Sequence, residues 1–352
     1  MTIDLAQRLT DATTATLELF AVHLGRELGL YESLDRHGPC TAAQLAERAG
    51  IAERYAQEWL EQQAVAGVLE VASGNDPASR SFALPGAHRG ALVDPIDGDH
   101  VAPFAGMVVG IAQALDDVVE AYRSGEGVPY ARYGAAFRHG QGGINRPAFS
   151  TDLVKAWLPA VEGLDERLDG GTVLDVGTGH GWSAIAVQAA WPSARVIGLD
   201  TDAASIEEAR ANAARAGVDV AFELVQPATG ADLTAHGPVD VVLVLEALHD
   251  MAQPAEVLRA ARAALAPGGL VVIADEAVAE DFTAPGDELE RMMYGWSVTH
   301  CLPAAMADQP SAAIGTAIRP STVAQLALEA GFGRCDVVDV DAGFFRLYRL
   351  AD

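Results

Sequence analysis

The chain has 352 residues, half of them hydrophobic, and a formal net charge of −26; this length allows two domains, and the apolar content allows a core that needs no metal or disulfide. The negative charge should repel nucleic acid and anionic membranes, so we expect neither as a partner. Three widely spaced cysteines, no signal-peptide pattern and no apolar run long enough to span a bilayer predict a cytoplasmic protein without a metal site.

Residues 1–95 predict a small domain of helices followed by two short strands. Apolar side chains recur at helical spacing over residues 14–36. Thr41 and Gln44 fit a capping box at the start of the next helix, and glycines stand where helices should end. Helix, helix–turn–helix and β-hairpin in this order predict a winged helix. The expected later elements are helices over Thr41–Gly50 and Glu53–Ala66 and strands over Val68–Val71 and Ser81–Leu84.

Residues 96–165 predict a connector whose first half is helical. Its second half, Arg123–Pro147, is rich in Gly, Tyr and Arg and includes Gly140-Gln141-Gly142-Gly143. Long glycine-rich loops in compact proteins are usually lids or binding loops, or else disordered, so we expect a lid here. Its arginines could admit an anionic ligand, but we favour ion pairs with the acidic body of the protein. These arginines are Arg123, Arg132, Arg138 and Arg146.

From Gly170 the pattern changes to short apolar runs that alternate with helical segments. The runs are continuous and rich in Val, Leu and Ile, which is typical of buried parallel strands. Residues 166–352 therefore predict a doubly wound, Rossmann-like α/β sheet that closes with a C-terminal antiparallel hairpin. The expected strands are Thr172–Val176, Arg195–Leu199, Asp240–Leu245, Leu270–Ala274, Cys335–Val340 and Phe344–Leu350, and the expected helices are Trp182–Ala190, Ala203–Ala216 and Pro254–Leu265.

The first of these strands runs directly into Gly177-Thr178-Gly179-His180-Gly181 and then a helix. Glycines let the backbone turn sharply and approach a ligand closely. The spacing is neither the GxGxxG of dinucleotide binders nor a phosphate-binding P-loop. Asp200 ends the next strand, where a carboxylate can accept both hydroxyls of a ribose, and Asp175 could meet a cationic amino group. The alternative is a glycine-rich turn with a helix cap and a surface acid.

Residues 170–350 resemble the class I S-adenosylmethionine-dependent methyltransferases. The family's first motif matches Leu174–Gly181, its ribose-binding acid matches Asp200, and a later motif matches Leu265-Ala266-Pro267-Gly268-Gly269. The whole chain looks like a bacterial subfamily of small-molecule O-methyltransferases with an N-terminal winged helix. This wider resemblance includes the segments Asn145-Arg146-Pro147 and Met293-Tyr294-Gly295-Trp296-Ser297.

The resemblance implies S-adenosyl-L-methionine as the cofactor, held by the glycine loop and neighbouring acids. Many relatives hold the adenine amine with an Asp after the third strand, where this chain has Gln226-Pro227. Gln226 could still accept through its side-chain oxygen. The implied cofactor-binding residues are Asp175, Gly177, Thr178, Gly179, Gly181, Asp200, Thr201, Gln226 and Glu246.

A polar segment, Leu248-His249-Asp250, follows the end of a predicted parallel strand, where ligands gather. It resembles the Leu-His-Asp-Trp motif of O-methyltransferases, with Met251 replacing the tryptophan, which implies that His249 is the general base. An unperturbed imidazole, with a pKa of about 6.5, is largely neutral in the cytosol. A purely structural histidine is the alternative. Asp250 is expected to cap a helix, and Glu246 is expected to act in catalysis by orienting His249, or to orient the methionine moiety.

Met292, Trp296 and His300 recur at intervals of four within the segment Asp287–Cys301, which predicts a shared helix face. Such a face is usually core, but in the family this segment roofs the substrate pocket. Adjacent residues on a helix point apart, so no pair between His300 and Cys301 is expected. The implied substrate-binding residues are Tyr133, Asn145, Phe149, Met292, Trp296 and His300.

Methyl transfer to a small-molecule hydroxyl oxygen is the function that these features favour, with nitrogen and carbon acceptors left open. One alternative is a winged-helix regulator that senses a ligand through a methyltransferase-like domain; another is different chemistry of the bound sulfonium. The predicted recognition helix carries Glu53, Glu58 and Glu61 against Arg54 alone, which argues against DNA binding. The apolar surface of residues 14–36 predicts that the N-terminal domain forms a homodimer.

Overall fold

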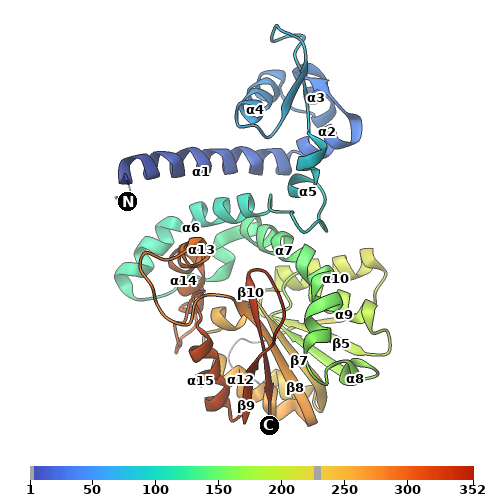
Figure 1. The fold of residues 1–352 in the computed structure, drawn as a ribbon, viewed down its shortest axis with the longest axis vertical. Coiled ribbons are helices and arrows are strands. Elements are labelled where there is room, and N and C mark those ends of the chain that lie inside the picture. The colour runs from blue at the N-terminus through green and yellow to red at the C-terminus, as the bar shows by residue number, and fades with distance from the viewer. Residues whose placement is uncertain (1–3, 226–230) are drawn as a thin grey trace. The chain divides into compact units, whose positions relative to one another are not determined.

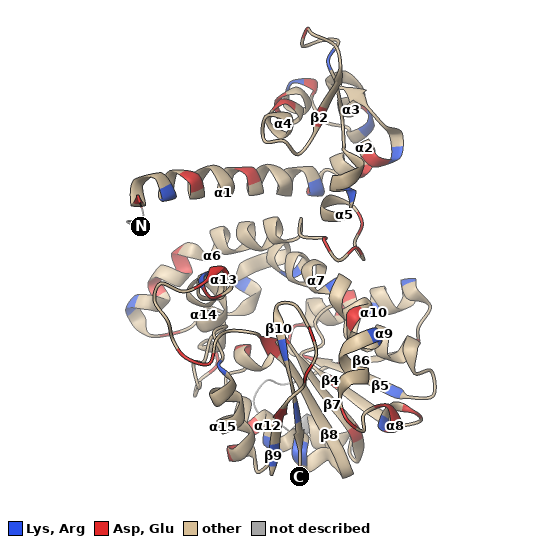
Figure 2. Cartoon of the chain, in the orientation of Figure 1, with Lys and Arg blue, Asp and Glu red and all other residues tan. Residues whose placement is uncertain are grey.

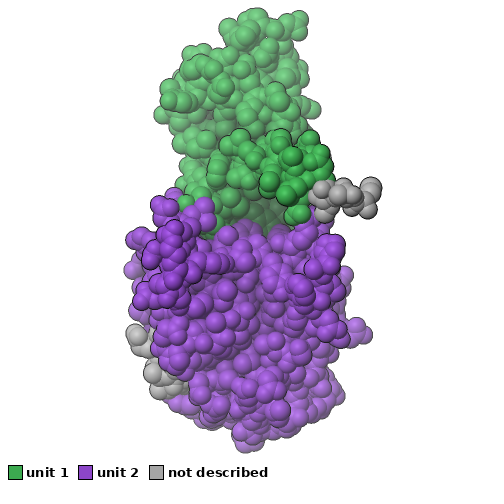
Figure 3. Space-filling view, turned by 90° about the vertical axis from the view of Figure 1, so that its left-hand side faces the viewer, with its two compact units in different colours: residues 1–112, 135–147 green, residues 113–134, 148–352 purple. Residues whose placement is uncertain are grey.

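The computed structural model describes residues 4–225 and 231–352 (Figure 1). The chain forms two compact units, residues 1–112 with 135–147, and residues 113–134 with 148–352 (Figure 3). Helices α6 (Phe104–Ser124) and α7 (Gly134–Ser150) contribute residues to both. Within the described ranges, no helix has the length and apolar content needed to cross a membrane. Acidic residues are distributed over elements of both units (Figure 2).

The first unit contains a winged helix, as the sequence predicts. Its three strands pair in the order β1-β3-β2, and its core includes Tyr31, Leu45, Leu60 and Phe82. The capping box of Thr41 and Gln44 is present. The elements are α1 (Leu5–Glu27), α2 (Leu30–His37), β1 (Cys40–Thr41), α3 (Ala42–Ala49), α4 (Glu53–Val65), β2 (Glu70–Ser73), β3 (Ser81–Ala83) and α5 (Arg89–Leu92).

The helical spacing over residues 14–36 belongs to two helices rather than one. Gly29, between α1 and α2, has a φ of 63°, a left-handed conformation that ends the first helix. Leu30 and Leu34 of α2 are buried, whereas Leu17 and Leu24 of α1 are exposed. The apolar pattern therefore combines a core-facing helix with a helix whose leucines lie at the surface.

The loop conformation expected over residues 123–147 is wrong, because most of this stretch is helix α7, while its role as a lid stays a prediction. Its glycines serve close packing against α6 within the first unit. A Cβ on Gly140 would lie 2.7 Å from the backbone N of Met107, and one on Gly106 would lie 2.8 Å from the carbonyl oxygen of Ala136. Glycine therefore permits two helix backbones to approach closely here, and no loop conformation is required.

The second unit contains one seven-stranded sheet in the order β6-β5-β4-β7-β8-β10-β9. The first five of these strands pair in parallel, and β10 runs antiparallel to both β8 and β9. All six expected strands are present, and the C-terminal hairpin is confirmed. The strands are β4 (Thr172–Val176), β5 (Arg195–Asp200), β6 (Ala221–Leu224), β7 (Val239–Leu245), β8 (Leu265–Glu276), β9 (Arg334–Val337) and β10 (Phe345–Ala351).

Helices cover both faces of this sheet (Figure 1). One apolar cluster joins the sheet to α9, α10 and the segment around Trp157, and a second joins it to α12 and α15. The helices are α8 (Asp165–Leu168), α9 (Trp182–Ala190), α10 (Ala203–Ala216), α11 (Ala231–Ala235), α12 (Pro254–Ala264), α13 (Glu288–Trp296), α14 (Leu302–Ala305) and α15 (Pro320–Ala330). Short π-helical turns occupy Leu153–Trp157 and Ser297–Cys301.

Candidate cofactor site and reaction centre

The glycine loop between β4 and α9 has a backbone that requires its glycines. Gly177, Gly179 and Gly181 have φ values of 77°, 51° and 77°, all in the left-handed region. A Cβ on Gly177 would lie 2.6 Å from the Cβ of Ala247, whereas a Cβ on Gly179 would meet nothing within 4 Å. The loop therefore packs closely against Ala247 at Gly177, whereas there is open space beside Gly179.

Two acids, the buried Asp175 and the partly buried Asp200, hold the loop in place. Asp200, at the end of β5, accepts hydrogen bonds from the backbone N–H groups of Gly179 (2.7 Å) and Asp202 (2.9 Å). Asp175, in β4, accepts from the hydroxyls of Thr178 (2.7 Å) and Ser183 (2.6 Å). Burial raises the pKa of both carboxyls, and the hydrogen bonds partly oppose this shift. Both acids therefore face the loop with fixed orientations.

His249 lies in a single 3₁₀ turn, Leu248–Asp250, directly after β7, and is almost completely buried. Its Nδ1 lies 2.6 Å from Asp275 Oδ1 and 3.2 Å from Glu276 Oε2, and its Nε2 lies 3.3 Å from Asp250 Oδ1. Asp275 and Glu276 end β8, which pairs in parallel with β7. Adjacent parallel strands thus bring a histidine and two carboxyls together at one edge of the sheet.

The carboxylates reverse the expected charge of His249. Burial alone lowers the pKa of this imidazole, but Glu276, Asp275 and Asp250 outweigh burial and raise it well above 6.5. The expectation of an unperturbed, neutral imidazole is therefore wrong. Burial, opposed by the charge of His249, also raises the pKa of Glu276 well above its usual value. These shifts favour an ion pair between His249 and Asp275 and the protonated form of Glu276.

His300 and Cys301 approach this centre from the π-helical turn that follows α13. The His300 ring packs edge-on against Tyr133 at 4.4 Å and Tyr130 at 5.7 Å between ring centroids. Burial lowers the pKa of His300 to about 3, so this imidazole is neutral. The sulfur of Cys301 and ligand atoms of His249 and Asp250 all lie within 4.8 Å of one another. The turn thus lies beside the catalytic candidate.

The expectation that His300 and Cys301 point apart is wrong, because Nδ1 and Sγ are 3.4 Å apart. The π-helical turn changes the angle between neighbouring side chains from that of an α-helix. Burial nevertheless raises the pKa of Cys301 to about 12, so the sulfur stays a thiol. The two residues touch without forming a thiolate pair.

Comparisons with known proteins agree with this geometry. Residues 168–319 match the family model described as a methyltransferase domain, and residues 15–93 match the Rv2258c-like winged HTH domain. The solved structure of human N-acetylserotonin methyltransferase in complex with SAM is similar over 100% of this chain and 99% of that one, with a TM-score of 0.72 and 16% identity. Residues 168–319 therefore form a methyltransferase domain, and the likeness to the solved structure shows a shared fold.

Curated relatives match through part of the methyltransferase domain. The ubiquinone biosynthesis O-methyltransferase of Caulobacter vibrioides is 36% identical over 112 residues, which are 30% of this chain and 41% of that protein. The ribosomal protein L11 methyltransferase of an Enterobacter species is 33% identical over 134 residues, which are 38% of this chain and 44% of that protein. The chain thus spans less than half the length of these relatives. Their names indicate different methyl acceptors.

The predicted methyltransferase domain, winged helix and fold are confirmed by these matches. Within the methyltransferase domain, the structure brings Asp175, Thr178 and Asp200 together around the glycine loop, with Thr201 exposed beside Asp200. Glu246, at the end of β7, is half-buried and has an unusual positive φ of 51°. Gln226 lies outside the described residues.

The predicted substrate-binding residues fall into different places. Tyr133 contacts His300 near the reaction centre, and Met292 and Trp296 are half-buried on α13. Phe149 lies in the hydrophobic core, 6.2 Å from Trp157 and 6.0 Å from Phe345 between ring centroids. Asn145 belongs to the first compact unit.

Asp250 does not cap a helix, contrary to expectation. It ends the 3₁₀ turn of His249, and α12 begins four residues later at Pro254. Sequence reasoning missed Asp275, Glu276 and Ser183. The first two could have been found, because polar residues directly after a buried parallel strand lie at the ligand-binding edge of the sheet.

Two arginines of the expected lid have acidic partners. Arg132 Nε lies 2.7 Å from Asp117 Oδ2, and Arg123 Nη1 lies 3.3 Å from Glu120 Oε2. The favoured interpretation, ion pairing with the acidic body of the protein, is correct for both.

Proposed function

We propose that the chain transfers a methyl group from S-adenosylmethionine to a hydroxyl oxygen of a small molecule, with His249 as the general base. The observation that carries this proposal is the buried Asp275–His249 contact of 2.6 Å at the carboxyl edge of the sheet. An acid that holds one imidazole nitrogen fixes the ring, and the acceptor hydroxyl would replace Asp250, now 3.3 Å from Nε2, as the partner of the other nitrogen. β7 pairs with β4, so this edge adjoins the glycine loop.

The residues of the loop fit the cofactor. Gly179 leaves open space beside its backbone, next to the carboxylate of Asp200, where a ribose could lie. We assign cofactor binding to the glycine loop, the two acids that hold it and the groups beside them. The set is Asp175, Gly177, Thr178, Gly179, Gly181, Asp200, Thr201 and Glu246, together with Gln226 outside the described residues.

In the proposed mechanism the bound sulfonium supplies the methyl group, and this chain supplies positioning and proton removal. His249 takes the hydroxyl proton at Nε2, while Asp275 holds Nδ1–H and stabilises the resulting charge. Because the carboxylates raise the pKa of His249, the base is available only when pH is high enough to deprotonate it. We assign Tyr133, Met292, Trp296 and His300 to the acceptor's surroundings, together with Asn145 and Phe149 as predicted.

The test is a screen of aromatic hydroxy compounds with methyl-labelled cofactor, followed by identification of the methylated atom by NMR. We expect an O-methyl product, and His249→Ala should lower turnover by about 10²–10⁴-fold while leaving the affinity for S-adenosylhomocysteine unchanged. Products methylated only on nitrogen or carbon, or a variant with turnover close to that of the native chain, would contradict the proposal.

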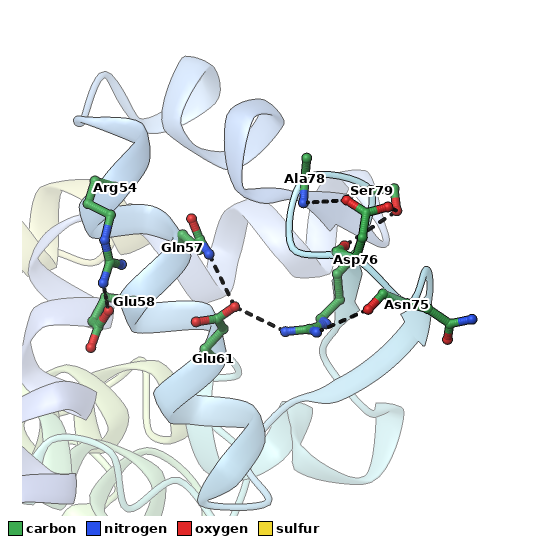
Figure 4. A network of polar contacts seen from close by, with 9 residues as sticks. Arg54, Gln57, Glu58, Glu61, Asn75, Asp76, Ala78 and Ser79 are labelled. Carbon is green, nitrogen blue, oxygen red and sulfur yellow. Dashed lines mark hydrogen bonds and ion pairs between the residues drawn. The ribbon is translucent and has the colours of Figure 1, made fainter.

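Three further features are proposed for the whole protein: no nucleic-acid partner, a cytoplasmic location and a homodimer. Two arginines of the winged helix form ion pairs with acids of the same domain (Figure 4). Arg54 pairs with Glu58 on α4, and Arg80 Nη1 lies 3.0 Å from Glu61 Oε1. Paired arginines offer little attraction for phosphates, which disfavours the alternative of a DNA-binding regulator. The three cysteines are free thiols, which suits a reducing compartment.

A further inference from the structure

The reaction centre holds more buried carboxyl groups than the proposed base requires. Asp250, Asp275 and Glu276 surround the single imidazole of His249, at 3.3, 2.6 and 3.2 Å. Glu246, at the end of β7, adds to the negative field at Glu276. We call Asp250, Asp275 and Glu276 the acid cluster.

Positive charge does not balance this cluster. Within the described parts of the chain, the ion pairs of Asp250, Asp275 and Glu276 all go to His249. The nearby His300 is neutral, since burial lowers its pKa to about 3. Arg346 lies opposite Asp275 on β10, but its guanidinium donates to the carbonyl of Val278 at 2.8 Å.

Two observations show that the acid cluster is not fully satisfied by the protein itself. Asp275 is completely buried, and its Oδ2 accepts no hydrogen bond from any described group. Burial raises the pKa values of Glu276 and of the partly exposed Asp250, with the charge of His249 opposing the shift, which favours the protonated forms of these carboxyls. Buried carboxyls that cannot ionise for lack of positive charge are places where a cation binds favourably.

We propose that the acid cluster binds a cationic group of a ligand at the reaction centre, in addition to orienting His249. This inference rests on the proposed function in one respect: the donor and acceptor meet beside His249. The cation is a monovalent organic group, either the sulfonium of the donor or an ammonium on the acceptor. An acceptor that carries a carboxylate is disfavoured, because its negative charge would oppose ionisation of these carboxyls in a low-dielectric site.

The first arm of the test compares S-adenosylmethionine with S-adenosylhomocysteine, which lacks the methyl group and the positive charge. Calorimetry on the metal-free full chain should show tighter binding of the cationic cofactor. The expected ratio is on the order of tenfold, the effect of unit charges about 10 Å apart at an effective dielectric constant of about 20. Repeating the titration in buffers of different ionisation enthalpy should reveal proton release with the cationic cofactor alone, as the carboxyls lose their protons.

The second arm keeps S-adenosylhomocysteine bound and compares dopamine, catechol and 3,4-dihydroxybenzoate. These ligands share one hydroxylated ring and differ in charge, from positive to neutral to negative. If the acceptor supplies the cation, affinity should fall in that order.

Two variants test whether the charge preference in either arm depends on the acid cluster. Glu276→Gln and Asp250→Asn should each move the preference toward parity while retaining S-adenosylhomocysteine binding, which also shows that the variant folds. Glu207→Gln, an exposed residue of α10, is the matched control and should leave the preference unchanged. Tighter binding of S-adenosylmethionine in the first arm identifies the cation as the sulfonium. A preference for the positively charged ligand in the second arm alone identifies it as an ammonium group of the acceptor.

Three results would overturn the inference: no charge preference in either arm, a preference that survives both variants, or a stoichiometric metal ion held by the cluster in the protein as purified. Retained binding of S-adenosylhomocysteine in these cases would leave the proposed methyl transfer standing. Absence of turnover with every acceptor, despite a clear charge preference, would count against the proposed methyl transfer alone.

Discussion

The imidazole of His249 shows how strongly neighbours decide what one residue can do. The sequence motif correctly placed a histidine at the carboxyl edge of β7, but it carried no information on Asp275 and Glu276, which come from a separate strand. Their effect depends on parallel pairing between β7 and β8, a long-range feature that no local pattern encodes. The position of His249 at the reaction centre was therefore predictable from the sequence, whereas the charge of its imidazole was not.

The charge of His249 can be measured without any acceptor. Because the neighbouring acids outweigh burial and raise its pKa well above 6.5, the imidazole should stay protonated at pH 6.5 and lose its proton only at higher pH. NMR titration of histidine-labelled protein should show this shift, and Asp275→Asn should move the pKa downward by removing the closest negative charge. His300 is an internal comparison, since a pKa of about 3 predicts no titration near neutrality. An ordinary titration of His249 near 6.5 would contradict this account.

Asp200 provides a second test at the residue scale. Its carboxylate both positions the N–H of Gly179 and, in the proposed function, accepts ribose hydroxyls. Asp200→Ala should weaken S-adenosylhomocysteine binding, since each charge-assisted hydrogen bond contributes roughly 1.5–3 kcal/mol. Isothermal titration calorimetry measures this loss. Asp219→Ala removes an exposed acid of the same domain and should leave the affinity unchanged; equal affinities for both variants would remove Asp200 from the cofactor site.

At the scale of elements, buried strands were the easiest features to predict. β4, β5, β7 and β8 are continuous apolar runs because both faces of the sheet are covered by helices. The edge strand β6, Ala221–Leu224, lacks such a run, because three of its four residues are exposed. The π-helical turn at Ser297–Cys301 was also invisible, since a regular period of 3.6 residues was assumed there.

The glycine-rich stretch gives a test of helix packing. Gly140→Ala would place a Cβ 2.7 Å from the backbone N of Met107 and 2.8 Å from the carbonyl oxygen of Pro103, neither of which can move freely. Overpacking of this kind costs roughly 1–3 kcal/mol, so the variant should unfold at lower temperature in calorimetry. Gly295→Ala, in α13 with open space around the added Cβ, should instead leave stability unchanged or raise it slightly. A neutral Gly140→Ala would mean that the glycines are not required for packing.

At the scale of the whole molecule, the net charge of −26 and the exposed leucines of α1 point to different kinds of contact. The charge disfavours polyanions, whereas exposed apolar side chains on a long helix favour association with another apolar surface. Leu5, Leu9 and Leu17 are each at least 60% exposed, although they lie on a well-formed helix. Isolated helices with exposed leucines are costly in water, so a covering partner is expected.

We predict that this partner is a second copy of the chain, bound through α1. Leu9→Glu with Leu17→Glu introduces charge into the apolar surface, and buried unpaired charge strongly disfavours association. Light scattering after size exclusion should therefore show a dimer for the native chain and a monomer for the double variant. Leu328→Glu places the same change on α15, where the leucine is 66% exposed, and should leave the dimer intact. A native chain that is monomeric at micromolar concentration, or a control variant that dissociates equally, would show that α1 does not form the interface; unchanged S-adenosylhomocysteine binding by the double variant would show that loss of the dimer is not due to unfolding of the methyltransferase domain.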